Sequence, residues 1–453
     1  MFTKKKTVAP QNPMFSPKDL KKLIVPLVIE QTLAVTVGMA DTVMVSSVGE
    51  AAVSGVSLVD MINLLLISLF AALATGGAVV SAQYIGARDT EKARQSAVQL
   101  LFVSFMCAFV LATLALCFNR PLLKMIFGSV EADVMNNAVI YFMYSAISYP
   151  FLALYNACAA LFRSSANSKV SMLVSLLMNF INIAGNAILI FGFDMGVAGA
   201  AIATLVSRVV AALVMMYLIA NPSNAIYIDF KEKFKIDPKM ILKILRIGVP
   251  NGLENSFFQF GKIIVIRIVT LFGTAQIAAN AVANNLASFG NIPGMAMGLA
   301  LITIIGQCIG AKEYEQATYY TKKVMKYAHI SMFCVHLIVA LALPILLKLY
   351  SLSEQAIYYA FVIIVMHSIC AAIFWPESFA LPNALRAAND VKYTMWVSIA
   401  SMIVFRIAFS YVFGLGFKLG VIGIWLAMFV DWVCRNSIFT YRFFVAKKWK
   451  KSI

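Results

Sequence analysis

A few acidic side chains interrupt long apolar stretches of this sequence. Asp41, Asp60, Glu254, Glu377 and Asp431 each lie among residues apolar enough to cross a membrane. A charge at the centre of a bilayer costs ~2.5–3.5 kcal/mol on insertion scales, so such a residue needs a counter-charge or a function. Carboxylates at this depth can hold a proton or a Na⁺ ion. We therefore treat these five residues as candidates for cation coupling.

Glu254 is a leading candidate for a proton or Na⁺ site. The alternative is a structural role, in which Glu254 pairs with Lys262 or Arg267 on the same apolar stretch. Glu377, which follows a proline in another stretch, is a candidate partner for Glu254 because two neighbouring acids can hold a cation between them. The sequence leaves both roles open.

The basic residues of the apolar stretches need partners as well. Asp431 and Arg435 stand four residues apart, a spacing at which helix neighbours neutralise each other, so a structural ion pair is favoured over cation coupling there. Arg208, Arg267 and Arg406 are expected to bind carboxylates or helix ends rather than substrate. An anionic substrate would raise their importance.

Other reactive side chains show no catalytic or metal-binding spacing. The seven cysteines form no C-x-x-C pair and are interpreted as small apolar packing residues. His329, His336 and His367 are scattered over two apolar stretches. Neither H-E-x-x-H nor G-x-S-x-G occurs in the sequence. A membrane-embedded enzyme is therefore disfavoured, and we expect no cofactor.

The composition predicts the elements that must position these residues. Of the 453 residues, 61% are hydrophobic and 13% are charged, against about 25% charged in a soluble domain. Apolar runs near twenty residues, long enough to cross a ~30 Å hydrocarbon layer, recur along the whole chain. We predict an all-α polytopic membrane protein with twelve spans, at residues 23–47, 52–82, 97–118, 134–157, 170–191, 197–220, 247–272, 277–309, 327–347, 357–379, 393–413 and 421–444.

The net charge of +17 indicates membrane orientation rather than nucleic-acid binding. Most of the 37 Lys and Arg residues fall on one side of the predicted spans, which the positive-inside rule makes cytoplasmic. We expect both termini in the cytoplasm, a location in the inner or plasma membrane, and no cleaved signal peptide. The basic side includes Lys4, Lys5, Lys6, Arg88, Arg163, Lys231, Lys233, Lys235, Lys322 and Arg386.

The two halves of the sequence repeat each other. The segment Gln83-Tyr-Ile-Gly-Ala aligns with Gln307-Cys-Ile-Gly-Ala at an offset of 224 residues. Six spans per half is an even number, so both halves enter the membrane in the same direction, an arrangement that serves alternating access. The same offset joins Pro26 to Pro250, Glu30 to Glu254, Gly49 to Gly273 and Gly196 to Gly420, whereas Arg163 and Lys169 match Arg386 and Lys392 at 223.

This duplication predicts the division of the chain. We expect residues 1–220 to form an N-lobe, residues 221–240 a basic cytoplasmic linker and residues 241–453 a C-lobe. Pro26 and its counterpart Pro250 are candidate hinges, because proline bends a helix. Two pseudo-symmetric lobes enclose a cavity without a second subunit, so we expect a monomer.

Several motifs resemble one transporter family. Pro26-Leu-Val-Ile-Glu30-Gln, followed by Gly38-Met-Ala-Asp41-Thr42, is similar to the first span of the multidrug and toxic compound extrusion (MATE) family. The Gly-Gln-x-x-Gly-Ala element after span eight, its partner after span two, and Leu385-Arg386-Ala-Ala after span ten extend the resemblance over nearly the whole chain. The Gly-x-x-x-Asp-Arg loop of major-facilitator carriers is absent.

The resemblance implies an exporter of bulky, amphipathic and often cationic compounds, driven by inward flow of H⁺ or Na⁺. It also implies an N-lobe cation site that includes Asp41. Thr204 is a further candidate as a supporting polar residue. In the family, an Asn and an Asp on span five often complete that site, but Asn182 and Asn186 stand here. The missing carboxylate shifts weight toward Glu254 and other C-lobe carboxylates. Glu30, the repeat counterpart of Glu254, and Arg435 are candidate supporting polar residues, and a structural role is favoured for Glu30.

We therefore predict a secondary active antiporter for multidrug efflux, with small amphipathic substrates and H⁺ or Na⁺ as its partners. A Na⁺ ion at Glu254 is the one metal site that we expect. A lipid-linked precursor flippase is the alternative transporter, although such proteins tend to have more spans and a strongly cationic cavity.

Overall fold

The computed structural model describes residue 10 and residues 12–128, 130–229, 235–348, 350 and 352–451. Lys4, Lys5, Lys6, Lys231 and Lys233, which the sequence places on the basic side of the spans, lie outside these residues. Within the described part, helices and their connecting turns make up the whole structure. The chain is thus an all-α polytopic membrane protein.

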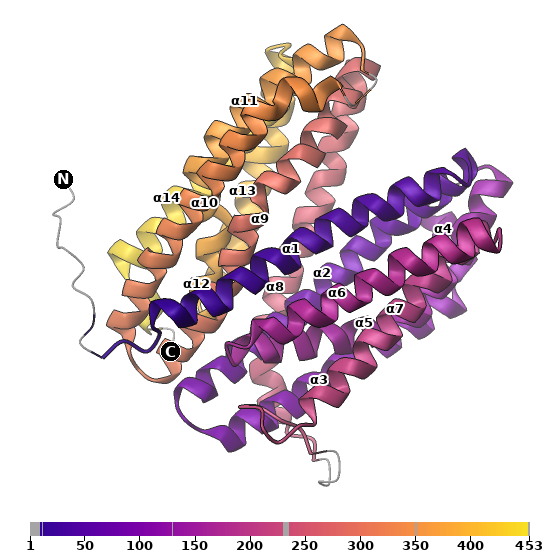
Figure 1. The fold of residues 1–453 in the computed structure, drawn as a ribbon. Coiled ribbons are helices and arrows are strands. Elements are labelled where there is room, and N and C mark those ends of the chain that lie inside the picture. The colour runs from indigo at the N-terminus through magenta and orange to yellow at the C-terminus, as the bar shows by residue number, and fades with distance from the viewer. Residues whose placement is uncertain are drawn as a thin grey trace. The chain divides into compact units, whose positions relative to one another are not determined.

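Twelve helices of the described residues are long and apolar enough to cross a membrane, which confirms the twelve predicted spans. Four spans contain π-helical turns, at η1 Ala187–Gly192, η3 Pro376–Ala380, η4 with η5 (Met402–Ala408 and Tyr411–Gly416) and η6 Tyr441–Ala446. The α-helices are α1 Pro17–Ser46, α2 Glu50–Gly86, α3 Thr90–Cys117, α4 Asn119–Phe127, α5 Ala132–Ser164, α6 Ser168–Asn186, α7 Gly196–Ile219, α8 Pro238–Val269, α9 Thr274–Gly310, α10 Tyr314–Lys348, α11 Glu354–Trp375, α12 Leu381–Ala387, α13 Val391–Ser401 and α14 Gly420–Thr440 (Figure 1), and η2 Thr270–Phe272 and η7 Lys448–Lys451 are short 3₁₀ turns.

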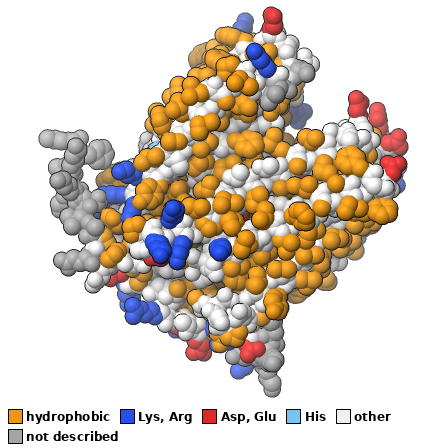
Figure 2. Space-filling view, viewed as in Figure 1, with side chains coloured by type: hydrophobic (Ala, Val, Ile, Leu, Met, Phe, Trp, Pro, Cys, Tyr) orange, Lys and Arg blue, Asp and Glu red, His pale blue; other side chains and the backbone are white. Residues whose placement is uncertain are grey.

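Apolar side chains cover most of the visible helix surfaces, as Figure 2 shows in orange. Phe180 is 69% exposed and Leu341 is 73% exposed. Such exposure would be costly in water but is favourable against lipid tails. The surface therefore agrees with a protein that spans a membrane many times.

The chain divides into two compact units, which we call the N-unit, Ile29–Asn255, and the C-unit, Met1–Val28 with Ser256–Ile453. These bounds differ from the lobes expected at residues 1–220 and 241–453. The divisions fall inside α1 and α8, shortly after Pro26 and Pro250, rather than in the linker at 221–240. The first part of each of these helices thus belongs to a different unit from the remainder.

Contacts within each unit explain these divisions. In the C-unit, the chain just before α1 is held to α10, because the Tyr320 hydroxyl accepts a hydrogen bond from Phe15 N at 2.9 Å. In the N-unit, the start of α8 packs closely on α2, where a Cβ added to Gly248 would lie 3.2 Å from Leu73 Cα. The end of the linker is held to α3, since Gln99 Nε2 donates to Lys235 O at 2.7 Å.

Helix α5 forms the centre of the N-unit and packs against α2, α3 and α7. A glycine allows α2 to approach α5, because a Cβ added to Gly55 would lie 2.8 Å from Val134 O. In the C-unit, α9 packs against α10, α11 and α12. These central helices position the polar side chains described next.

Candidate functional site

Asp41 lies in a polar site of the N-unit formed by α1, α6 and α7. Asn186 Nδ2 donates to Asp41 Oδ1 at 2.7 Å. With its amide oriented to satisfy both neighbours, Asn182 also donates to Asp41 Oδ1 at 2.7 Å and accepts from Thr204 Oγ1 at 3.1 Å. The structure thus brings together Asp41, Asn182, Asn186 and Thr204, four residues that the sequence analysis selected.

The amide of Asn186 leaves one oxygen available in this site. Its Oδ1 atom is buried and has no hydrogen-bond partner in the described structure. A carboxylate, an amide oxygen and a hydroxyl are the oxygen ligands that hard cations such as Na⁺ prefer. Asp41, Asn186 and Thr204 can supply this chemistry to Na⁺, and Asp41 alone can supply it to a proton.

Asp60 on α2 lies in a second polar group of the N-unit. Asn63 Nδ2 donates to Asp60 Oδ1 at 3.2 Å, and the Tyr149 hydroxyl donates to Asn63 Oδ1 at 2.8 Å. The Tyr141 hydroxyl is a further hydrogen-bond partner of Asp60. Because α5 supplies both tyrosines, the close packing of α2 on α5 positions this carboxylate.

Arg208 on α7 connects the two carboxylates electrostatically. Its guanidinium donates to Ser148 Oγ at 2.7 Å, and its charge acts on both Asp41 and Asp60. Asp41 also experiences the negative charge of Asp60. With both carboxylates ionised, the three groups carry a net charge of −1. One bound H⁺ or Na⁺ would neutralise them.

Glu30 is held in an ion pair elsewhere in the N-unit. Arg163 Nη1 donates to Glu30 Oε1 at 2.8 Å, and Ser171 Oγ donates to Glu30 Oε2 at 2.7 Å. Glu30 is 7% exposed, so the pair is largely removed from solvent. These contacts link α1 with α5 and α6 and describe a structural carboxylate.

Two further acidic candidates are Glu254 on α8 and Glu377 in η3. Glu254 on α8 is 7% exposed and belongs to the N-unit, whereas Glu377 belongs to the C-unit. Glu377 Oε1 lies 2.6 Å from His329 Nε2. Histidine was not predicted as its partner, because the two residues lie in different spans and no pattern in the sequence links them.

Asp431 and Arg435 form the ion pair that their spacing predicts. Arg435 Nε donates to Asp431 Oδ1 at 2.9 Å, and Ser401 Oγ bonds the same carboxylate. Arg435 also donates to Ser398 O at 3.0 Å. The side chains are 0% and 3% exposed, respectively, so the pair is buried between α14 and α13.

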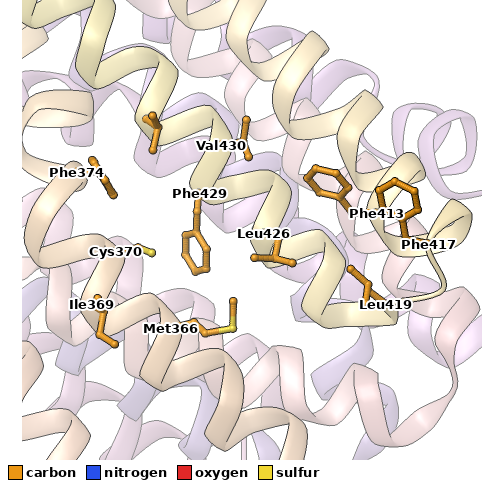
Figure 3. A pocket seen from close by; sticks show the side chains of 11 residues that line it. Met366, Ile369, Cys370, Phe374, Phe413, Phe417, Leu419, Leu426, Phe429 and Val430 are labelled. Atoms are coloured by element: carbon orange, nitrogen blue, oxygen red, sulfur yellow. The ribbon is translucent and has the colours of Figure 1, made fainter.

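A pocket of about 610 Å³ lies on the C-unit between α11, η5 and α14 (Figure 3). Phe413 and Phe417 lie at one end of it, and Phe374 and Cys370 at the other. No charged or hydrogen-bonding group lines this pocket, so it can accept an acyl chain but cannot orient a polar substrate. The lining residues are Met366, Ile369, Cys370, Phe374, Phe413, Phe417, Leu419, Leu426, Phe429, Val430 and Val433.

Sequence reasoning missed the contribution of α5 to the Asp60 site. Tyr141, Ser145, Ser148 and Tyr149 follow one another at helical spacing along one face of this span. A polar stripe of this kind in an apolar helix is a signal of an internal site, and it was available in the sequence.

The MatE family model matches this chain twice, over residues 26–188 and 250–412. The second match begins 224 residues after the first, which is the offset of the internal repeat. Two matches of equal length within one chain support the duplication that the repeated motifs predict.

Proteins of known sequence and structure resemble the chain over nearly its full length. The uncharacterized transporter YisQ of Bacillus subtilis is 28% identical and covers 98% of this chain and 97% of its own. The probable multidrug resistance protein NorM of Thermotoga maritima is 25% identical and covers 96% and 93%. A solved outward-facing MATE family transporter of the MOP superfamily is 21% identical, with a TM-score of 0.88 and 96% coverage of both chains.

Proposed function

The chain belongs to the MatE family of membrane transporters, and from this premise we propose that it is a secondary active antiporter for amphipathic organic compounds, including organic cations. The driving force is the inward flow of H⁺ or Na⁺. It is a transporter rather than an enzyme. We place it in the cell membrane with both termini in the cytoplasm, on the basis of its one-sided basic residues. We propose a monomer, because two pseudo-symmetric halves can form a cavity without a second subunit.

The charge balance of the N-unit carries this proposal. The charge of Arg208 acts on both Asp41 and Asp60, so the three groups together have a net charge of −1 that one H⁺ or Na⁺ would neutralise. A multi-span protein would be stabilised by neutralising an uncompensated charge within its apolar interior. Coupling follows if the occupied and empty states favour different helix packing.

The hydrogen bonds of Asp41 supply a route from ion binding to helix movement. Asn182 and Asn186 donate to its carboxylate and thereby link α1 to α6. Such charge-assisted bonds are roughly twice as strong as neutral ones, so neutralising Asp41 weakens the link. The second part of α1 can then move about Pro26, near which the chain passes from one unit to the other.

Structures similar to this chain have been solved in two named conformations. One is described as MATE in the straight conformation and another as MATE in the bent conformation, both 22% identical to this chain, with TM-scores of 0.87 and 0.79. We propose that α1 of this chain adopts a straight and a bent form, with Pro26 as its hinge and Pro250 as the counterpart in α8.

Transport into proteoliposomes tests the proposal. Purified protein is reconstituted, a proton gradient and a sodium gradient are imposed separately, and uptake of the fluorescent cation ethidium is followed. We expect uptake with one gradient and its loss in Asp41→Asn. Wild-type uptake that is indifferent to both gradients would refute ion-coupled antiport.

Glu254→Gln, at equal membrane abundance, separates the two candidate coupling sites. Loss of uptake in Asp41→Asn but not in Glu254→Gln places coupling at Asp41. Intact uptake in Asp41→Asn with loss in Glu254→Gln would refute the assignment to Asp41 and support Glu254.

A further inference from the structure

Three basic side chains converge on one aromatic ring in the C-unit. Lys262 Nζ lies 5.2 Å from the centroid of the Phe258 ring, Arg406 Cζ lies 5.6 Å from it, and Arg435 Cζ lies 5.7 Å from it. Any two of these cations therefore lie within roughly twice these distances of each other. They come from three different spans, so the fold itself gathers them.

Only one of the three cations has a described carboxylate partner. Arg435 is paired with Asp431, as given above. In the part of the chain that the structure describes, no ion pair is formed by Lys262 or Arg406, and Arg406 Nε is buried without a hydrogen-bond partner. The charged neighbour that acts on Lys262 is Arg406, another cation, whereas Arg406 is acted on by Asp431 and by Arg435. The three cations are thus opposed by one carboxylate. The cluster thus carries an excess of positive charge.

The Lys262 and Arg406 side chains both lie far from the nearer ends of their spans. Lys262 lies about ten residues from the span end at Phe272, and Arg406 about ten residues from the span end at Gly416. At 1.5 Å per residue this is about 15 Å, more than a side chain can reach to place its charge in the headgroup region. An unneutralised charge at this depth is costly and indicates a binding partner.

Aromatic rings adjoin the cluster. Phe379 packs edge-on against Phe258 at 5.9 Å between ring centroids, and Trp375 stacks on Phe379 at 5.0 Å. Trp432 meets Phe379 at 6.0 Å. Lys262 is exposed and the Phe258 ring is half-buried, so a ligand can reach both. Together these side chains can hold an acidic group beside an aromatic one.

The internal repeat shows where this cluster stands relative to the Asp41 site. Lys262 lies three residues before Val265, which is the counterpart of Asp41 at an offset of 224. Between Lys392 and Gly416 the chain has one residue more than between their counterparts Lys169 and Gly192. A π-helical turn accommodates such an inserted residue, and η4, which contains Arg406, is a π-helix in this stretch.

The N-unit has no π-helix at the position that corresponds to η4. The inserted turn therefore places Arg406 in the segment that corresponds to the part of α6 bearing Asn182. The duplicated fold has carboxylate chemistry in one unit and cationic chemistry at the corresponding place in the other.

We propose that Lys262 and Arg406 form a binding site for the acidic group of an amphipathic aromatic anion, such as a carboxylate, sulfonate or phosphate. Its role as a substrate subsite rests on the proposed export function, which it extends to aromatic acids and zwitterions. Anion binding itself requires no gradient and no transport. It can therefore be tested separately from antiport.

The test uses two probes with the same ring and opposite charge, 1-pyrenesulfonate and 1-pyrenemethylammonium. The full-length protein is reconstituted in nanodiscs of neutral phosphatidylcholine without any gradient. Energy transfer from tryptophan to pyrene reports binding, since Trp375 and Trp432 adjoin the proposed site. We expect the sulfonate to bind at least tenfold more tightly than the ammonium probe.

Three variants locate the bound anion. Lys262→Met and Arg406→Gln should each weaken sulfonate binding about tenfold and leave the binding of the ammonium probe unchanged. Arg267→Gln, which removes a cation from α8 outside the cluster, should leave both unchanged. If Arg406→Gln proves unstable, Lys262→Met still decides the matter, because its side chain is exposed.

Two results would overturn the proposal: equal affinity of wild type for the two probes, or unchanged sulfonate affinity in Lys262→Met. Nanodiscs containing phosphatidylglycerol distinguish the sources of the anion. The sulfonate affinity of each protein in these nanodiscs is compared with its affinity in neutral nanodiscs. If the affinity falls further in wild type than in Lys262→Met, the lipid headgroup competes for the site, which supports the site with a lipid headgroup as its ligand. If the affinity falls equally in both proteins, the lipid does not compete at the site, which supports the site with a membrane-soluble amphiphile as its ligand. Failure of ethidium transport alone would refute antiport without affecting this result.

Discussion

Removing Arg163 should expose the cost of burying Glu30 without its counter-charge. Arg163→Met takes away the guanidinium that lies 2.8 Å from Glu30 Oε1 and leaves Ser171 as the remaining donor described for this carboxylate. Removing one partner of a buried ion pair costs about 3–5 kcal/mol, because the other charge stays in a medium that solvates it poorly. This is roughly a 10²–10⁴-fold change in the unfolding equilibrium.

Helix content measured by circular dichroism during SDS titration from lipid bicelles gives this free energy. Lys92→Met is the matched control, since its ion pair with Asp89 also measures 2.8 Å but lies at the surface, and we expect no measurable loss there. The double variant Glu30→Gln, Arg163→Met should recover most of the loss. Stability of Arg163→Met equal to that of wild type would refute a structural role for Glu30.

Three further predictions concern helices that position the candidate sites. Asn186→Leu removes the donor that lies 2.7 Å from Asp41 Oδ1, and a hydrogen bond to a charged group is worth about 1.5–3 kcal/mol. Gradient-driven ethidium uptake should therefore fall tenfold or more. Unchanged uptake would contradict coupling at Asp41. Gly55→Val should prevent the close packing of α2 on α5, because even a Cβ would lie 2.8 Å from Val134 O. Size-exclusion chromatography should show an aggregated or low-yield protein. A stable monodisperse variant would show that the two helices can separate. Pro26→Ala permits the missing backbone hydrogen bond within α1 and should slow uptake without lowering the unfolding free energy, whereas normal uptake would exclude Pro26 as a hinge.

Sequence patterns predicted the fold because membrane spans obey a strong local constraint. Every backbone group in the bilayer must be paired internally, so a long apolar run implies a helix whatever its neighbours are. The repeated segments at Gln83 and Gln307 then indicated a duplication, and the second MatE match at the same offset supports it. Loop charges and apolar runs do not indicate which part of α1 or α8 packs with which unit. The unit boundaries near Pro26 and Pro250 therefore became visible only in the structure.

The candidate sites were only partly predictable. Resemblance selected Asp41, Asn182 and Asn186, which the structure gathers with Thr204, and helical spacing selected Asp431 with Arg435. Contacts between spans lie beyond such local rules. The Glu377–His329 pair is therefore visible only in three dimensions.

The two halves of this protein share a fold but differ in chemistry, and the difference follows from small changes in sequence. At offset 224, Asp41 corresponds to Val265 and Arg208 to Trp432, so neither the carboxylate nor the cation of the N-unit site is repeated. One inserted residue and the π-turn η4 accompany Arg406 in the C-unit. If coupling occurs at Asp41 as proposed, the coupling cation binds in one unit without the same ion competing at the corresponding place in the other. The unit without this carboxylate can then recognise a different charge on a transported molecule, as we propose for Lys262 and Arg406.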